Sequence, residues 1–102
     1  MNWTLRVTSG SRRDLIRLKK SIDRRLYEEI LDAISALEED PLSVAAPMAN
    51  YRDHYKIRVR DYRVICYLSD ADRLIVVTRI RHRSEAYKGY ELTRRPGAPR
   101  SG

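Results

Sequence analysis

The chain has 102 residues, of which 42% are hydrophobic and 34% are charged, so it can form one domain with a modest core. Its apolar runs reach only four or five residues, which excludes a membrane-spanning helix. A single cysteine excludes an internal disulfide, and with only two histidines beside it no metal site or other cofactor is expected. The sequence favours a cytoplasmic protein.

The net charge of +7 lies entirely in the second half of the chain. Residues 1–50 carry eight basic and eight acidic residues, whereas residues 51–102 carry thirteen basic and six acidic ones. A one-sided basic surplus is typical of proteins that bind nucleic acid. Basic surfaces also serve solubility alone, so charge by itself does not decide between these two interpretations.

The first part of the chain predicts a strand followed by a helical hairpin. Alternation over residues 2–8 indicates a half-buried strand, and residues 11–39 indicate two helices with Ser11 and Ser21 as their N-caps. The second helix ends at Asp40–Pro41 because proline cannot continue it. The expected apolar stripes are Leu15, Ile16 and Leu18 in the first helix, and Ile22, Leu26, Ile30, Ile34 and Leu37 in the second.

The second half predicts three strands and a short helix, after a connection over residues 41–51. The expected strands are residues 55–59, 62–68 and 74–80, the expected helix is Ser84 to about Tyr90, and the expected basic tail is residues 94–102. The fold class is therefore α+β: an N-terminal strand, a helical hairpin, a three-strand antiparallel meander and a short C-terminal helix. We expect residues 1–93 to form one domain, with the helices on one face of the sheet.

Cations are predicted to gather on the other face of this sheet. A two-residue loop at Arg60–Asp61 would set Arg58 opposite Arg63, with Lys56 two residues along on the same face. Like charges that face each other across strands cost stability, so an anionic ligand is expected there. A merely solvated face would mix in acids, but Asp61 in the turn is the only acid across both strands.

A second group of cations ends the last predicted strand. It consists of Arg79, Arg81, His82 and Arg83, and Tyr87 follows it. The pattern does not decide which of these arginines shares the face of Lys56, because the loop over residues 69–72 permits a bulge. Tyr87 fits either a core anchor for the final helix or a functional phenol.

These residue types suit the cleavage of RNA without a metal. The sequence has no carboxylate pair, no glycine-rich phosphate loop and no triad order. RNA supplies its own nucleophile, the 2′-hydroxyl, which leaves charge compensation, a base and an acid to the protein. Arginine and lysine supply the charge, and adjacent cations lower a tyrosine pKa from its usual value of about 10. A metal-free ribonuclease is the functional hypothesis.

Residues 3–90 resemble the RelE/ParE superfamily of bacterial toxin–antitoxin systems. The segment from Tyr55 to Ile65 is similar to the family's Y-R-I-R-x-G-D-Y-R-V-x-Y pattern, and His82 to Tyr87 is similar to its H-R-x-x-x-Y pattern. The predicted order of strands and helices agrees with that of the family. The chain departs from the pattern in the turn, where Arg60 stands in place of the family's glycine.

The resemblance implies a ribosome-dependent mRNA interferase of the RelE type, which cuts message in the ribosomal A site and leaves a 2′,3′-cyclic phosphate. Lys56 and Arg63 would stabilise the phosphorane. Arg81 would protonate the leaving 5′-oxygen, and Tyr87 would act as general base on the 2′-hydroxyl. The expected RNA-binding residues are Arg58, Arg60, His82 and Arg83.

ParE-type members share this fold but act on DNA gyrase, and the cationic set favours RelE over ParE. The alternatives are therefore a gyrase inhibitor without nuclease activity and a basic nucleic-acid-binding module or inactive toxin. The partners implied by the resemblance are an acidic RelB-like antitoxin in a hetero-oligomer, mRNA and the 70S ribosome. No membrane partner is expected.

Overall fold

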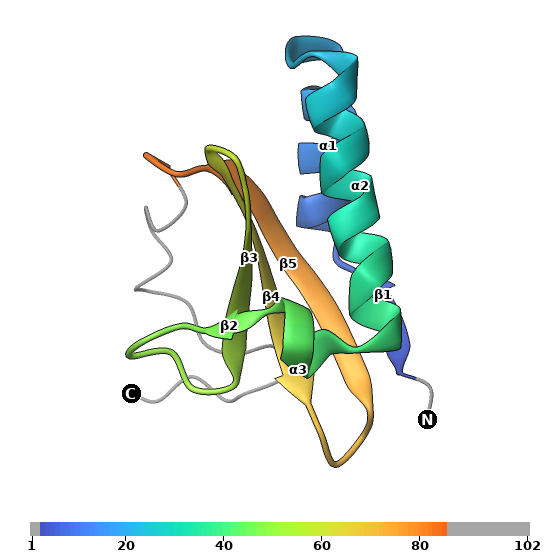
Figure 1. The fold of residues 1–102 in the computed structure, drawn as a ribbon, viewed down its shortest axis with the longest axis vertical. Coiled ribbons are helices and arrows are strands. Elements are labelled where there is room, and N and C mark those ends of the chain that lie inside the picture. The colour runs from blue at the N-terminus through green and yellow to red at the C-terminus, as the bar shows by residue number, and fades with distance from the viewer. Residues whose placement is uncertain (1–2, 86–102) are drawn as a thin grey trace.

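The computed structural model describes residues 3–85 (Figure 1). Its elements are β1 (Thr4–Val7), α1 (Ser9–Ser21), α2 (Arg24–Glu39), α3 (Pro41–Val44), β2 (Ala46–Pro47), β3 (His54–Val59), β4 (Tyr62–Ser69) and β5 (Leu74–His82). None of the helices within that range is both long and apolar enough to cross a lipid bilayer. Ser84 and Glu85 form a turn, and the rest of the predicted final helix, like the basic tail, lies outside the described residues.

Within residues 3–85 the strands form one five-stranded sheet in the order β1-β5-β4-β3-β2. β3, β4 and β5 are the predicted antiparallel meander, and β1 pairs with β5 in parallel, so the predicted α+β class is confirmed. The connection over residues 41–51 is more ordered than predicted. Pro41 opens the short helix α3, where its missing N–H costs nothing, and Ala46–Pro47 adds β2 to the edge of β3.

Both long helices begin at residues other than the predicted caps. The side chain of Thr8 accepts a hydrogen bond from the Ser11 N–H at 3.1 Å, so Ser11 lies in the first turn of α1. Asp23 caps α2 by accepting from the Leu26 N–H at 3.0 Å, and Ser21 is the last residue of α1. Threonine, serine and aspartate all cap well, so local sequence did not discriminate among them.

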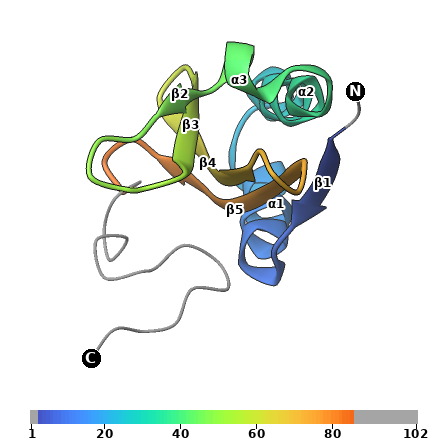
Figure 2. The same ribbon diagram turned by 90° about the horizontal axis from the view of Figure 1, so that it is seen from below.

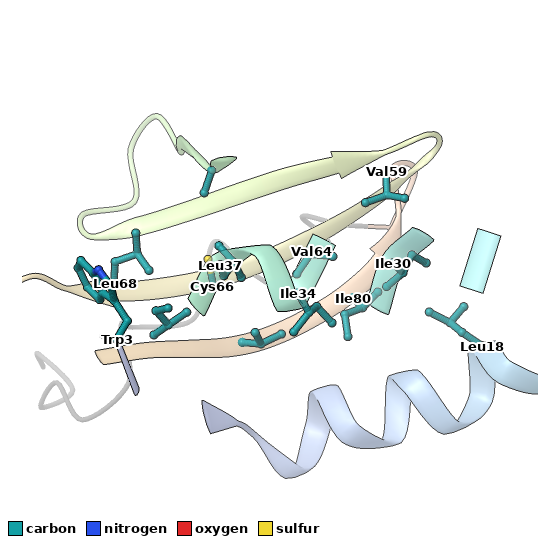
Figure 3. Close-up of a cluster of buried hydrophobic side chains, with 13 residues drawn as sticks. Trp3, Leu18, Ile30, Ile34, Leu37, Val59, Val64, Cys66, Leu68 and Ile80 are labelled. Carbon is teal, nitrogen blue, oxygen red and sulfur yellow. The ribbon is translucent and has the colours of Figure 1, made fainter. Parts of the chain in front are cut away.

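The apolar face of α2 forms the centre of the core, as its spacing predicts. Ile30 and Leu37 are completely buried and Ile34 nearly so, while Ile22 and Leu26 pack at the margin. Figure 3 shows Ile30, Ile34 and Leu37 over the strands. The strand residues of this core are Val59, Val64, Cys66, Leu68, Ile75, Val77 and Ile80. α2 therefore covers one face of the sheet (Figure 2).

α1 lies along the edge of β5 rather than over the sheet face (Figure 3). Its apolar stripe differs accordingly from the prediction: Leu18 is buried, but Ile16 is 55% exposed. The helix offers polar side chains to the strand instead. The Ser11 hydroxyl donates to the Val77 carbonyl at 2.8 Å, and the Asp14 carboxylate accepts from the Ile80 N–H at 3.0 Å. The first bond lies at the end of the pairing with β1, which reaches Val77. The second lies beyond it, where β5 has no neighbouring strand on this side and needs another partner for its backbone.

The turn between β3 and β4 is tied to α2. Arg60 has a φ of 55°, a left-handed conformation that favours glycine. Its guanidinium makes a two-pronged contact with Glu29 of α2, with Nε–Oε1 and Nη2–Oε2 distances of 2.9 Å. The hydrogen bond from Arg60 lowers the pKa of Glu29. Arg60 thus anchors the turn to the helix that carries the core.

Replacing Ile30 by alanine should lower the free energy of unfolding by about 2–5 kcal/mol, because the side chain is completely buried and a cavity would remain. Ile16→Ala, on the exposed side of α1, should change it by about 0.5 kcal/mol or less. Urea unfolding measures both. Similar losses for the two variants would contradict the assigned core.

The Glu29–Arg60 pair should stabilise the fold in a pH-dependent way. Because the Glu29 pKa is lowered in the folded state, its contribution is present above the unfolded-state value and is lost as the pH falls through the folded-state value. The difference in unfolding free energy between the wild type and Glu29→Gln should therefore be largest near neutral pH and should shrink as the pH falls below the unfolded-state value of about 4.3. Glu38→Gln, on the same helix, is the charge-matched control, and a difference that grows on acidification would refute the pair's role.

Candidate functional site

Two rows of cationic residues cross the meander on one face of the sheet. In the first row Arg63 of β4 lies between Arg58 of β3 and Arg81 of β5. In the second row Lys56 of β3 and Arg79 of β5 flank the central strand, two residues further along. The predicted pairing of Arg58 with Arg63 is confirmed. We call these five residues the cationic rows.

A β-bulge decides which arginines of β5 belong to the cationic rows. Val77 faces the core, whereas Arg79 lies opposite Ile65, so Thr78 is an extra residue between them. Side chains alternate along a strand, and without the extra residue Arg79 and Arg81 would share the face of Val77. The structure thus answers the question that the sequence left open.

The face with the cationic rows is only partly open. α2 covers the opposite face, but the connection before β3 folds over part of this one, where Met48 and Tyr51 pack against the fully buried Ile65. A recess of about 250 Å³ lies beside Lys56 and is lined by Met48, Ala49 and Tyr51. The recess sets an aromatic ring close to a cation at the end of the second row.

The three guanidinium groups of the first row point in different directions, which increases the distance between their positive charges. Arg58 is exposed. Arg63 Nη1 donates to the carbonyl oxygens of Arg60 and Tyr62 at 3.1 and 3.0 Å. Arg81 reaches the β5 edge, where its Nη2 lies 3.5 Å from Asp14 Oδ1. Its Nε is buried and has no hydrogen-bond partner within residues 3–85, which costs free energy.

Asp14 is a residue of this site that the sequence analysis missed. It is 3% exposed, its Oδ2 accepts from the Ile80 N–H, and its Oδ1 faces Arg81. A signal was present in the sequence: Ser11, Asp14 and Leu18 follow the spacing of one helix face. Two polar residues in line with a buried leucine indicate side chains that bond to a buried partner.

Two predicted RNA-binding residues lie away from the cationic rows. Arg60 turns to Glu29 on the side of the sheet that α2 covers. His82 packs its ring 5.4 Å from the ring of Tyr62, which borders the core, and its Nδ1 accepts from the Ser84 N–H at 3.2 Å. The structure does not bring these two side chains to the face of Arg63.

Arg83 and Tyr87 complete the predicted set. Arg83 is exposed beside the β3–β4 turn, where its N–H donates to the Asp61 carbonyl at 2.6 Å and its Nε lies 3.9 Å from the Asp61 carboxylate. Tyr87, the predicted general base, lies outside the described residues. Of the predicted catalytic residues, the structure therefore brings Lys56, Arg63 and Arg81 to neighbouring positions.

The chemistry that this site supports is the stabilisation of negative charge. Permanent cations in neighbouring strand positions suit a phosphate group whose charge rises during reaction. In the described part of the chain, no three side chains of His, Cys, Asp or Glu gather so that they could hold a metal ion. Cys66 is no nucleophile, because burial raises its pKa to about 12 and keeps the thiol protonated.

The chain matches known toxins over most of its length. A family model described as the ParE toxin of the type II toxin–antitoxin system parDE matches residues 5–87. Toxin RelG of Mycobacterium tuberculosis is 29% identical over 89 residues, which cover 86% of this chain and 99% of that protein.

Solved structures of toxins share the fold. The toxin–antitoxin complex RelBE2 of Mycobacterium tuberculosis gives a TM-score of 0.67 at 25% identity, over 81% of this chain and all of that one. A mutant of the Escherichia coli toxin RelE in the free state gives 0.67 at 18% identity, over 89% and 93% of the two chains. The Escherichia coli DinJ–YafQ complex gives 0.70 at 14% identity, over 85% and 99%.

Removing one cation from the first row should stabilise the fold at low salt. Arg58→Gln relieves repulsion with Arg63 across the strands, and the free energy of unfolding should rise by about 0.5 kcal/mol. Arg13→Gln makes the same change in net charge on the exposed side of α1 and should give a smaller gain. The difference should disappear in about 1 M NaCl, where screening is strong; an equal gain from both variants would count against repulsion within the row.

Proposed function

We propose that this chain, which belongs to the RelE/ParE superfamily of type II toxin–antitoxin toxins, is a metal-independent endoribonuclease that cuts messenger RNA. The observation that carries the proposal is the first cationic row, in which Arg63 lies between Arg58 and Arg81. Three neighbouring cations repel one another and lower the stability of a sheet. Such a cost is typical of a functional site, and a bound anion would offset the repulsion. A phosphodiester supplies that anion, and a reacting phosphodiester carries more negative charge still.

In the proposed reaction the 2′-hydroxyl oxygen attacks the adjacent phosphorus atom while Tyr87 takes the hydroxyl proton. Lys56 and Arg63 stabilise the charge on the phosphorane oxygens. The bond from phosphorus to the 5′-oxygen breaks while Arg81 donates a proton to the departing oxygen. Exchange with solvent then removes the proton that Tyr87 took up and returns one to Arg81. The products are a 2′,3′-cyclic phosphate and a free 5′-hydroxyl.

The remaining cations divide by position. Arg58 and Arg83 are exposed and would contact RNA phosphates on either side of the scissile bond. Arg60 and His82 do not enter this proposal, because their side chains lie on the helix-covered side. The recess of Tyr51 and Lys56 suits a base next to a phosphate, since an aromatic ring stacks on a base.

The proposed setting is translation in the cytoplasm, with message held in the A site of the 70S ribosome. An acidic antitoxin is the proposed inhibitor, because the basic surplus of residues 51–102 favours a partner of opposite charge. Among the structural relatives, RelBE2 and DinJ–YafQ are toxin–antitoxin complexes, which supports a hetero-oligomer of this kind.

Inhibition of DNA gyrase without nuclease activity is the second candidate. It is favoured by the family model, which is named for ParE toxins. The two candidates differ in product: a gyrase inhibitor causes cleaved DNA–gyrase complexes to accumulate and leaves message intact. The cationic rows support the nuclease, because they supply the positive charge that suits a phosphodiester whose negative charge rises during reaction.

Induction of the wild-type chain should produce cuts within codons of translated messages, mapped by primer extension. The double variant Arg81→Ala/Tyr87→Phe should reduce cutting by about 100-fold or more, because it removes both groups proposed to act on protons. Arg13→Gln, which changes charge away from the site, should cut as the wild type does.

Three outcomes separate the hypotheses. Persistent cutting by the double variant would refute the assigned catalytic residues. Intact message together with accumulated DNA–gyrase complexes would replace the nuclease by the gyrase inhibitor. Intact message, intact gyrase and unimpaired growth would indicate a binding module without toxicity.

A parallel reaction of the purified chain with ribosome-free RNA tests the ribosome requirement, and equal cutting there would refute it.

A further inference from the structure

We propose that Asp14 is a positioning residue for Arg81 in the cleavage reaction, an inference that rests on the proposed nuclease activity. Arg81 is a long side chain at the end of the last strand, and about a third of it is exposed. Such a side chain has several rotatable bonds and needs a fixed partner to act at one atom of a substrate. Asp14 contacts it with its carboxylate.

The carboxylate of Asp14 is itself held rigidly. Its Oδ2 accepts a hydrogen bond from the Ile80 N–H at 3.0 Å, so it is fixed to the backbone of the residue directly before Arg81. The side chain is 4% exposed, and α1 carries it within a helix whose first turn is also bonded to β5 through Ser11 and Val77. Asp14 therefore keeps one position relative to β5.

The other oxygen, Oδ1, serves two arginines. Arg17 of α1 donates from Nη2 at 2.9 Å, and Arg81 approaches with its own Nη2 at 3.5 Å. Arg17 is 54% exposed and pairs within its own helix, so it serves to neutralise the buried carboxylate. The contact with Arg81 uses one terminal nitrogen, which leaves Nη1 for an oxygen of the substrate. Asp14 thus orients the guanidinium without blocking it.

A purely structural role for Asp14 predicts something different. The bond to the Ile80 N–H needs only an acceptor oxygen, and asparagine supplies one in the same place. The contact with Arg81 needs the negative charge. In Asp14→Asn the amide nitrogen would take the place of Oδ1, and its N–H groups would face the N–H groups of the guanidinium. Asp14→Asn therefore separates the two roles: it keeps the bond to β5 and removes the hold on Arg81.

The test measures cutting of translated message by the full chain, with the melting temperature of each variant recorded to confirm folding. Asp14→Asn should slow cutting about tenfold or more, as expected when a reacting group loses its orientation. Binding of a non-cleavable RNA with 2′-deoxy substitution should stay within about twofold, since Arg81 is proposed to act at the departing oxygen and not in binding. Arg17→Gln is the matched control, because it removes the other partner of the same oxygen and should leave the rate within about twofold.

A double-mutant cycle then ties the effect to Arg81. In an Arg81→Ala background, Asp14→Asn should cause no further loss, because the group that it positions is gone. If Asp14→Asn does not fold, Asp14→Glu replaces it in the same cycle. This variant keeps the charge but shifts the carboxylate by one methylene group, so it should slow cutting only when Arg81 is present. Two results would overturn the role of Asp14 but not the nuclease proposal. One is a double variant whose loss of cutting rate equals the product of the two single losses, and the other is a folded Asp14→Asn that cuts at the wild-type rate. A wild-type chain that cuts no message would overturn the nuclease proposal together with this inference.

Discussion

The attachment of α1 to the edge of β5 is the interaction on which the site depends. β1 pairs with only the first half of β5, and from the end of that pairing onward side chains of the helix bond to the strand edge. Ser11 bonds to the Val77 carbonyl and Asp14 to the Ile80 N–H. Because the bulge lies between these two points, the helix also holds the strand where it changes which side chains face the core.

Stability and charge compete across this small sheet. One face is packed against α2, with residues such as Ile30 and Val64 completely buried, and the other face carries the cationic rows. Charges that repel one another lower stability, so the apolar face has to supply most of the free energy of folding. Arg60 contributes differently from the other cations, because it ties the turn to Glu29 of α2 and lies away from the face of the cationic rows.

Much of the fold follows from periodicity and turn chemistry. The spacing of apolar residues correctly indicated the buried face of α2, and the two-residue loop at Arg60–Asp61 fixed Arg58 opposite Arg63 because a tight turn leaves one register. The caps were wrong, since Thr8, Ser11, Ser21 and Asp23 are all acceptable caps locally. α3 and β2 were missed because elements this short are stabilised by their neighbours and have little periodicity of their own.

The fold class, the pairing of the first two meander strands and the surplus of cations on them could be read from the sequence alone, because they depend on residues close together in the chain. Three other features come from long-range packing: which arginines of β5 join that surplus, the contact between Asp14 and Arg81, and the placement of Arg60 and His82 on the other side of the sheet. A bulge and a helix packed against a strand edge depend on contacts between residues far apart in sequence, such as Asp14 with Ile80. The two-residue repeat of strands and the three- and four-residue spacing of helices describe only local sequence, so they cannot reveal such contacts.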